Sequence, residues 1–157
     1  ACATGAPGDD TGAPVDIVFV HSARTPADLI FREELTALGT RAGIRVGVCT
    51  DKRLDAAESS LRIADLHGSI PILTTFEDAP GPKPHPSGLL HSLSLLGAAP
   101  QASAYVGDTA VDMRAAKAAG MGAVAVTWGT GTRESLAEAE PDAIVDTREE
   151  LREVLLG

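Results

Sequence analysis

Runs of apolar, β-branched residues alternate with segments of helical spacing along most of the chain. The run at 15–20, VDIVFV, has Asp16 as its one polar residue, which is typical of a strand buried on both faces. The runs predicted as strands are 15–20, 44–49, 70–73, 102–106, 123–127 and 143–145, and those predicted as helices are 26–38, 51–66, 87–96, 109–119, 132–138 and 148–156. Strands that alternate with helices predict an α/β fold with a three-layer, doubly wound, mainly parallel sheet of five to six strands.

The pattern also predicts how the chain is divided. Residues 1–14 are small or turn-forming and have no period, so we expect a flexible leader there. Residues 15–157 are enough for one domain with a core and too few for two. Thr132 and Thr147 are expected to cap the two last helices, and Gly120 is expected to end the helix before it.

Composition excludes several classes of function. The formal net charge is −9, whereas a protein that binds nucleic acid or an anionic membrane surface needs the opposite sign. No apolar run approaches the roughly 18 residues of a membrane span, and no signal segment is seen. The two cysteines require neither a disulfide nor a zinc site, which favours a cytoplasmic protein. A small phosphorylated substrate stays compatible with this charge.

Two carboxylates follow the predicted strand 102–106. Ligands of doubly wound sheets bind at the carboxyl ends of the strands, and Gly107 allows a sharp turn there. Asp108 and Asp112 are four residues apart, so both can face one small volume. Oxygen ligands of this kind suit Mg²⁺. The alternative is that Asp108 only caps the helix and Asp112 is solvated.

Two further polar residues occupy comparable positions. Thr50 follows the strand 44–49 and would offer a hydroxyl and a backbone N–H to a phosphate oxygen at a helix start, or would be an ordinary helix cap. Lys83 lies in the proline-rich loop GPKPHP, where it could neutralise a phosphoryl group in a transition state. Its alternative is a solvated surface lysine.

Three segments together resemble the haloacid dehalogenase superfamily of phosphatases. VGVCTDK matches the second motif of that family with Thr50, GPKPHP the third with Lys83, and YVGDTAVDMRAAKAAGM the fourth with Asp108 and Asp112. The resemblance covers about 43–156, and AVAVTWGTGTRESL followed by PDAIVDTREEL is similar to the phosphoglycolate-phosphatase-like branch. It implies a Rossmann-like core, Mg²⁺ at the two aspartates, catalytic roles for Thr50 and Lys83, and a small phosphorylated substrate held by these two and Asp51.

The first motif of the family, D-x-D-G-T, has no match. The strand 15–20 is followed by HSART, so His21 stands in the slot of the nucleophile and Ala23 in that of the general acid and base. An alanine cannot transfer a proton. We therefore predict weak or no activity on phosphate monoesters.

The first part of the chain resembles a second family. VDIVFVHSARTPADLIFREELTAL is similar to the NAD(P)-binding domain of ferredoxin–NADP reductase-type flavoenzymes, where Ser22 and Arg24 would contact the nucleotide. We interpret the chain as a chimera of a reductase-like βα unit (15–38) and a phosphatase-like core (43–157). A diverged phosphatase whose first motif decayed is the alternative. An inert chimeric or designed scaffold and a pyridine-nucleotide-binding fragment remain as alternative functions.

Overall fold

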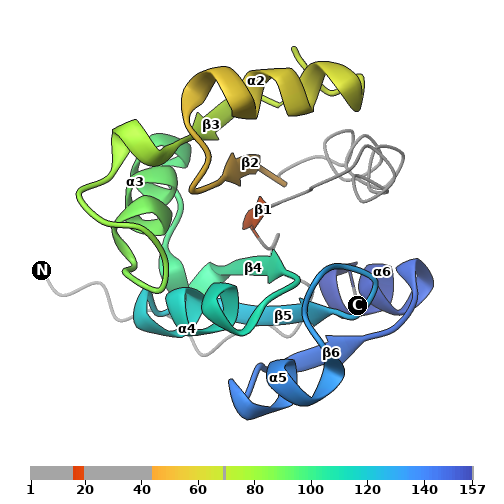
Figure 1. Ribbon diagram of the computed structural model, residues 1–157. Helices are drawn as coiled ribbons and strands as arrows, with labels where there is room; N and C mark the ends of the chain where they lie inside the picture. Colours follow the sequence, from red (N-terminus) through yellow and green to blue (C-terminus); the bar gives the residue numbers. More distant parts are fainter. Residues whose placement is uncertain (1–15, 20–43, 69, 157) are drawn as a thin grey trace, which may run out of the picture.

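The computed structural model describes residues 16–19, 44–68 and 70–156 (Figure 1). Within them six parallel strands form one sheet in the order β3-β2-β1-β4-β5-β6. The strands are β1 (Asp16–Phe19), β2 (Val46–Cys49), β3 (Ile72–Thr74), β4 (Ser103–Gly107), β5 (Gly122–Val126) and β6 (Ala143–Val145). The predicted doubly wound, parallel sheet is therefore confirmed.

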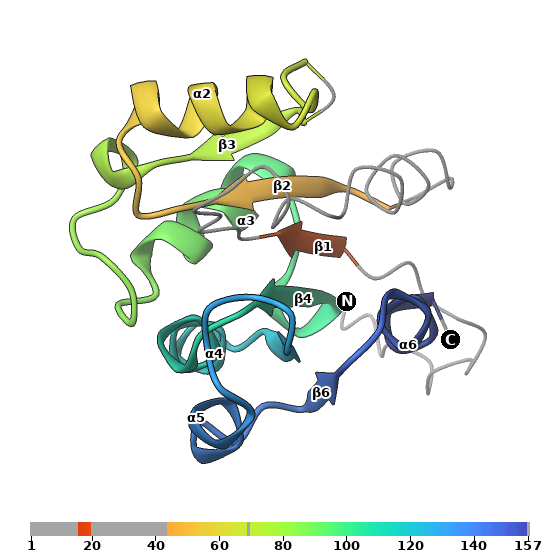
Figure 2. The same cartoon turned by 45° about the vertical axis from the view of Figure 1, so that its right-hand side comes forward.

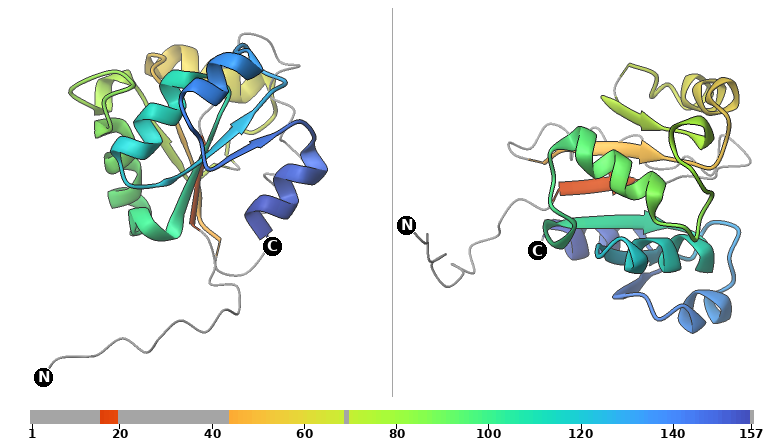
Figure 3. Two further views of the ribbon diagram at one scale, coloured as in Figure 1. Left: turned by 90° about the horizontal axis from the view of Figure 1, so that it is seen from below. Right: turned by 90° about the vertical axis from the view of Figure 1, so that its left-hand side faces the viewer.

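Helices cover both faces of this sheet, which gives the three layers that the sequence predicts (Figure 3). The α-helices are α2 (Leu54–Ile63), α3 (Ser87–Leu96), α4 (Ala110–Ala118), α5 (Arg133–Glu138) and α6 (Arg148–Leu156), and the short 3₁₀ helices are η2 (Phe76–Asp78) and η3 (Pro100–Ala102). None of the helices in the described residues is long and apolar enough to cross a membrane. The leader predicted at 1–14 and the helix predicted at 26–38 lie outside the described residues.

Strand β1 occupies the middle of the sheet, between β2 and β4 (Figure 2). Its last residue, Phe19, is paired with Val48 on one side and with Val106 on the other. The chain therefore leaves β1 between the carboxyl ends of β2 and β4. These are the ends that carry Thr50 and Asp108.

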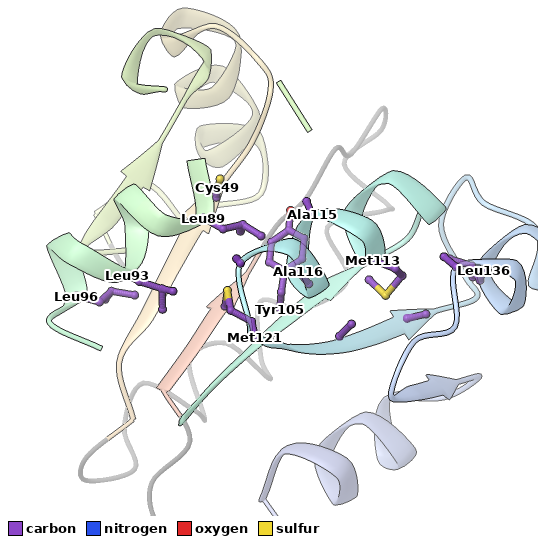
Figure 4. Packing of buried hydrophobic residues seen from close by; sticks show 14 residues of the cluster. Cys49, Leu89, Leu93, Leu96, Tyr105, Met113, Ala115, Ala116, Met121 and Leu136 are labelled. Carbon is purple, nitrogen blue, oxygen red and sulfur yellow. The ribbon is translucent and has the colours of Figure 1, made fainter. Parts of the chain in front are cut away.

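Two apolar clusters hold the layers together. One lies between the sheet and helices α2 and α6 and includes Leu61 and Leu151. The other lies between the sheet and helices α3, α4 and α5, and Figure 4 shows Leu89, Tyr105 and Met113 within it. Alanines fill much of the second cluster, so α4 can approach the sheet closely. Burying both faces of the sheet in this way supplies the apolar area that stabilises the fold.

Most element boundaries agree with the pattern, because helix caps and turns are encoded locally. Thr132 caps α5 by accepting a hydrogen bond from Ser135 N–H, and Gly120 follows α4 with a positive φ of 77°. The predicted start of the helix at residue 51 is wrong: α2 begins at Leu54. The Thr50 side chain accepts the N–H of Lys52 instead, which forms a turn before the helix.

Helix α3 offers a matched test of the second cluster. Leu93 is 3% exposed and Leu95 is 53% exposed, although both lie on the same helix. We expect Leu93→Ala to lower the free energy of unfolding by about 2–5 kcal/mol, because it leaves a cavity in the core. Leu95→Ala should change it by less than about 0.5 kcal/mol. Urea unfolding of both variants checks this, and equal losses would contradict the assignment.

Candidate functional site

A hollow of about 290 Å³ opens beside the carboxyl ends of β2 and β4. Its lining comes from the loop after β2, the loop before α3 and the first turn of α4, and consists of Thr50, Asp51, Lys52, Lys83, Thr109, Val111 and Asp112. The structure thus brings together four of the residues that the sequence predicts: Thr50, Asp51, Lys83 and Asp112. Asp108 is not among the lining residues and lies next to them in the chain.

A buried ion pair forms one wall of the hollow. Lys83 Nζ lies 2.5 Å from Asp112 Oδ1, and the two side chains are only 6% and 2% exposed. The alternatives of a solvated surface lysine and a solvated Asp112 are therefore wrong. Because charges taken out of water need partners, each of these residues depends on the other to remain buried.

Tyr105 completes this pair, although the sequence pattern does not place it in the site. Its side chain is fully buried; its hydroxyl accepts a hydrogen bond from Lys83 Nζ at 3.2 Å and donates to Asp112 Oδ1 at 3.4 Å. Burial, and next the charge of Asp112, raise the pKa of the Tyr105 phenol well above its usual value, so the hydroxyl stays neutral. The signal that could have indicated this role was that the chain's one tyrosine stands two residues before Gly107 and three before Asp108.

The second carboxylate oxygen of Asp112 accepts three hydrogen bonds. Oδ2 accepts hydrogen bonds from the N–H groups of Asp108 and Thr109 and from the Thr109 hydroxyl. Thr109 Oγ1 in turn accepts the N–H of Asp112, which makes a capping box at the start of α4. The alternative in which Asp108 caps this helix is wrong, because Thr109 is the cap.

Asp108 faces a different partner. It is 6% exposed, and its Oδ2 accepts hydrogen bonds from both the N–H and the hydroxyl of Thr130, at 2.8 and 3.1 Å. Thr130 lies in the loop that follows β5. The two predicted metal ligands thus have separate surroundings, although they are four residues apart.

The described residues fit a magnesium ion only in part. A carboxylate has about four lone-pair positions, and Asp112 already contacts five donors, so it does not fit as a direct ligand. Asp108 fits as a single carboxylate, which Mg²⁺ commonly combines with waters and substrate phosphate. Within 16–19, 44–68 and 70–156 no group of three or more His, Cys, Asp or Glu side chains could hold a metal.

Thr50 and Asp51 anchor the other side of the hollow. Thr50 is buried and its N–H donates to the carbonyl of Thr74, so the expectation that this N–H is available to a phosphate is wrong. Its hydroxyl accepts a hydrogen bond from Lys52 N–H and can still donate. The Asp51 carboxylate accepts the backbone N–H of Lys83 at 3.2 and 3.3 Å, which ties the lysine loop to the end of β2.

The remaining predicted site residues lie outside the described residues. These are His21, Ser22, Ala23 and Arg24, in the segment that directly follows β1. Their assignments to the nucleophile slot, the acid/base slot and nucleotide binding stay predictions.

Comparison with known proteins identifies the family. Residues 31–126, more than half of the chain, match the family model of the haloacid dehalogenase-like hydrolases. The chain therefore belongs to this family. The resemblance inferred from Thr50, Lys83, Asp108 and Asp112 is confirmed at that level, whereas the reductase ancestry of the first segment stays an interpretation.

Three individual relatives are named as phosphatases. The chain is 40% identical over 153 residues to the probable phosphatase IndB of Dickeya dadantii, covering 88% of this chain and 66% of the relative. It is 34% identical over 110 residues to the phosphoglycolate phosphatase of Salmonella paratyphi A, covering 70% and 44%. A crystal structure of a predicted phosphoglycolate phosphatase from Haemophilus somnus shares the fold with a TM-score of 0.70 at 23% identity, covering 79% and 55%. The chain thus spans between 44% and 66% of the length of these relatives.

The buried ion pair can be tested through stability. We expect Lys83→Met to lower the free energy of unfolding by about 3–5 kcal/mol, because it leaves the Asp112 carboxylate buried without a counter-charge. In the double variant with Asp112→Asn, much of this loss should be recovered, and urea unfolding of the full cycle measures the coupling. Additive losses would show that the two charges do not depend on each other. Arg133→Met at the exposed pair with Asp146 is the control, with an expected change below about 1 kcal/mol.

Cys49, at the end of β2, provides a test by pH. Burial raises the pKa of its thiol from 9.0 to about 11. The charge of Lys83 lowers this pKa, but its effect is smaller than that of burial. Because the folded pKa lies above the unfolded one, the stability from the neutral thiol is fully present below about pH 9 and is lost as the pH rises through 11. Between pH 8.5 and 10.5 the wild type should lose more stability than Cys49→Ala. Parallel losses in urea unfolding would contradict this.

Proposed function

We propose that this chain binds the phosphoryl group of a small phosphorylated molecule in the hollow beside β2 and β4, and that it hydrolyses phosphate monoesters weakly or not at all. The observation that carries the proposal is the buried ammonium of Lys83, which lines the hollow next to Thr50. A cation in a site of low dielectric attracts an anion far more strongly than one in water. The acidic net charge of the chain does not oppose this, because two lysines, Lys52 and Lys83, balance the two carboxylates Asp51 and Asp112 in the lining of the hollow.

The donors around the hollow support binding of a phosphoryl group. Among the described residues, Lys83 Nζ donates to Tyr105 and Asp112, which leaves one of its three N–H groups for a ligand. The Thr50 hydroxyl supplies a second donor. The Asp51 carboxylate has no N–H or O–H group to donate to a phosphoryl group. It accepts the backbone N–H of Lys83 and so fixes where the lysine loop meets the end of β2.

The names of the relatives support the proposed substrate class. The matched relatives are named a probable phosphatase and a phosphoglycolate phosphatase. This chain carries Thr50, Lys83 and Asp108, the residues that the resemblance assigns to phosphate chemistry. A hollow of about 290 Å³ is at the small end of the range for ligand pockets. Both observations favour a small phosphorylated molecule over a polymer.

We assign the metal role to Asp108 and not to Asp112. Asp108 is the carboxylate that would hold Mg²⁺ together with waters and phosphate oxygens. When bound there, the ion would offset the negative charge of the phosphoryl group. Asp112 contributes by holding the Lys83 ammonium in place.

Weak turnover is proposed from the sequence that follows β1. The chain leaves β1 between β2 and β4, the place at which the family carries its nucleophile, and there it reads VHSA with no carboxylate before Asp28. Ala23 has no group that can transfer a proton. Because catalytic residues act as a unit, the loss of two removes most of the rate that the others could support.

A gain of function tests this proposal. The wild type should hydrolyse para-nitrophenyl phosphate with Mg²⁺ at most slowly. The double variant His21→Asp, Ala23→Asp should raise kcat/KM by roughly 10²-fold or more, because it restores a nucleophile and an acid/base group. Asp108→Asn in this background should abolish the gain. Robust turnover by the wild type that is lost in Asp108→Asn would overturn the proposed weak activity.

A further inference from the structure

The loop between β5 and α5 holds Asp108 from outside its own motif. Residues 127–132, with the sequence TWGTGT, connect Val126 at the end of β5 to Arg133 at the start of α5. The backbone N–H of Gly131 donates to the Asp108 carbonyl at 3.0 Å. The N–H and the hydroxyl of Thr130 both donate to Asp108 Oδ2. Three hydrogen bonds therefore fix the backbone and the carboxylate of one residue.

The two glycines of the loop make this approach sterically feasible. A Cβ atom at Gly129 would overlap the Cβ and Oδ2 atoms of Asp108, and one at Gly131 would overlap the Asp108 carbonyl oxygen. The loop therefore lies against Asp108 so closely that no larger residue fits at either position. A close approach of backbone to a functional group is a common reason for a glycine.

The hydrogen bonds of Thr130 are not needed to cap helix α5. Thr132, not Thr130, caps α5, because its side chain accepts Ser135 N–H. Thr130 is itself exposed, and its partner lies 22 residues earlier in the chain. Its two donors converge on one oxygen of a carboxylate that is 6% exposed. Donors that converge on a carboxylate restrict its rotation and select the direction in which it can bind a cation.

We propose that Thr130 is a positioning residue for Asp108: the 127–132 loop clamps the carboxylate and thereby sets its affinity for a divalent cation. The inference rests on the proposed role of Asp108 as the magnesium ligand. It adds a residue that lies outside the four family motifs and assigns a role to the glycine-rich loop after β5.

Titration of Mg²⁺ into the full chain by isothermal calorimetry tests the clamp without relying on turnover. Thr130→Val removes the hydroxyl and keeps the N–H, and we expect the Kd for Mg²⁺ to rise by roughly 10–100-fold, as is typical when a partner of a metal ligand is lost. Thr130→Ser keeps a hydroxyl and should bind within about threefold of the wild type, well short of that loss. The matched control is Thr132→Val, which removes a hydroxyl from the same loop and should lower the melting temperature with no change in Mg²⁺ affinity.

The outcomes separate the clamp from the proposed function. If Asp108→Asn abolishes Mg²⁺ binding while Thr130→Val binds like the wild type, the clamp is wrong and the metal role of Asp108 stands. If Thr132→Val weakens binding as much as Thr130→Val, the effect belongs to loop stability and the clamp is again wrong. If the wild type binds no Mg²⁺, both the metal role and the clamp are overturned.

Discussion

The pairing of Lys83 with Asp112 is the interaction on which the carboxyl edge of the sheet depends. It joins the loop before α3 to the first turn of α4, and Tyr105 connects both to the core beneath. Neither charge could remain buried alone, since the cost of desolvation exceeds what most single contacts return. The pair therefore positions three segments at once. The placement of the lysine ammonium and of the walls of the hollow depends on it, and the same Asp112 side chain also closes the capping box of α4.

The same arrangement bears on the anion site that we propose for this acidic chain. Asp112 and Asp51 both serve Lys83, one through the ammonium and the other through the backbone N–H. Their negative charges are thus used to hold the cation in place. A ligand in the hollow would meet the remaining N–H of the Lys83 ammonium and the hydroxyl of Thr50. Net charge governs partners as large as nucleic acid, whereas a small ligand responds to the nearest few groups.

Much of the fold and the position of the candidate site could be predicted from the sequence, because strand and helix periods and helix caps are local signals. Thr132, Gly120 and the motif from Gly107 to Asp112 are of this kind. The roles within the site depended on contacts between distant segments. Nothing local indicates that the N–H of Thr50 is taken by Thr74, or that Asp112 holds Lys83. The contact of Thr130 with Asp108 could not be predicted for the same reason. A threonine between two glycines is typical of an ordinary turn, and only the fold brings Asp108 next to it.

The central place of β1 has a consequence for the integrity of the chain. Strand β1 is hydrogen-bonded on both sides, so its removal would leave β2 with β3 and β4 with β5 and β6 as two half-sheets. Each half would present an open inner edge of unpaired N–H and carbonyl groups, which is a template for association with other chains. A proteolytic cut between residues 19 and 46 that released β1 would therefore produce fragments that are prone to aggregate. Any exchange of the segment after β1, by evolution or by design, has to retain those four residues of strand.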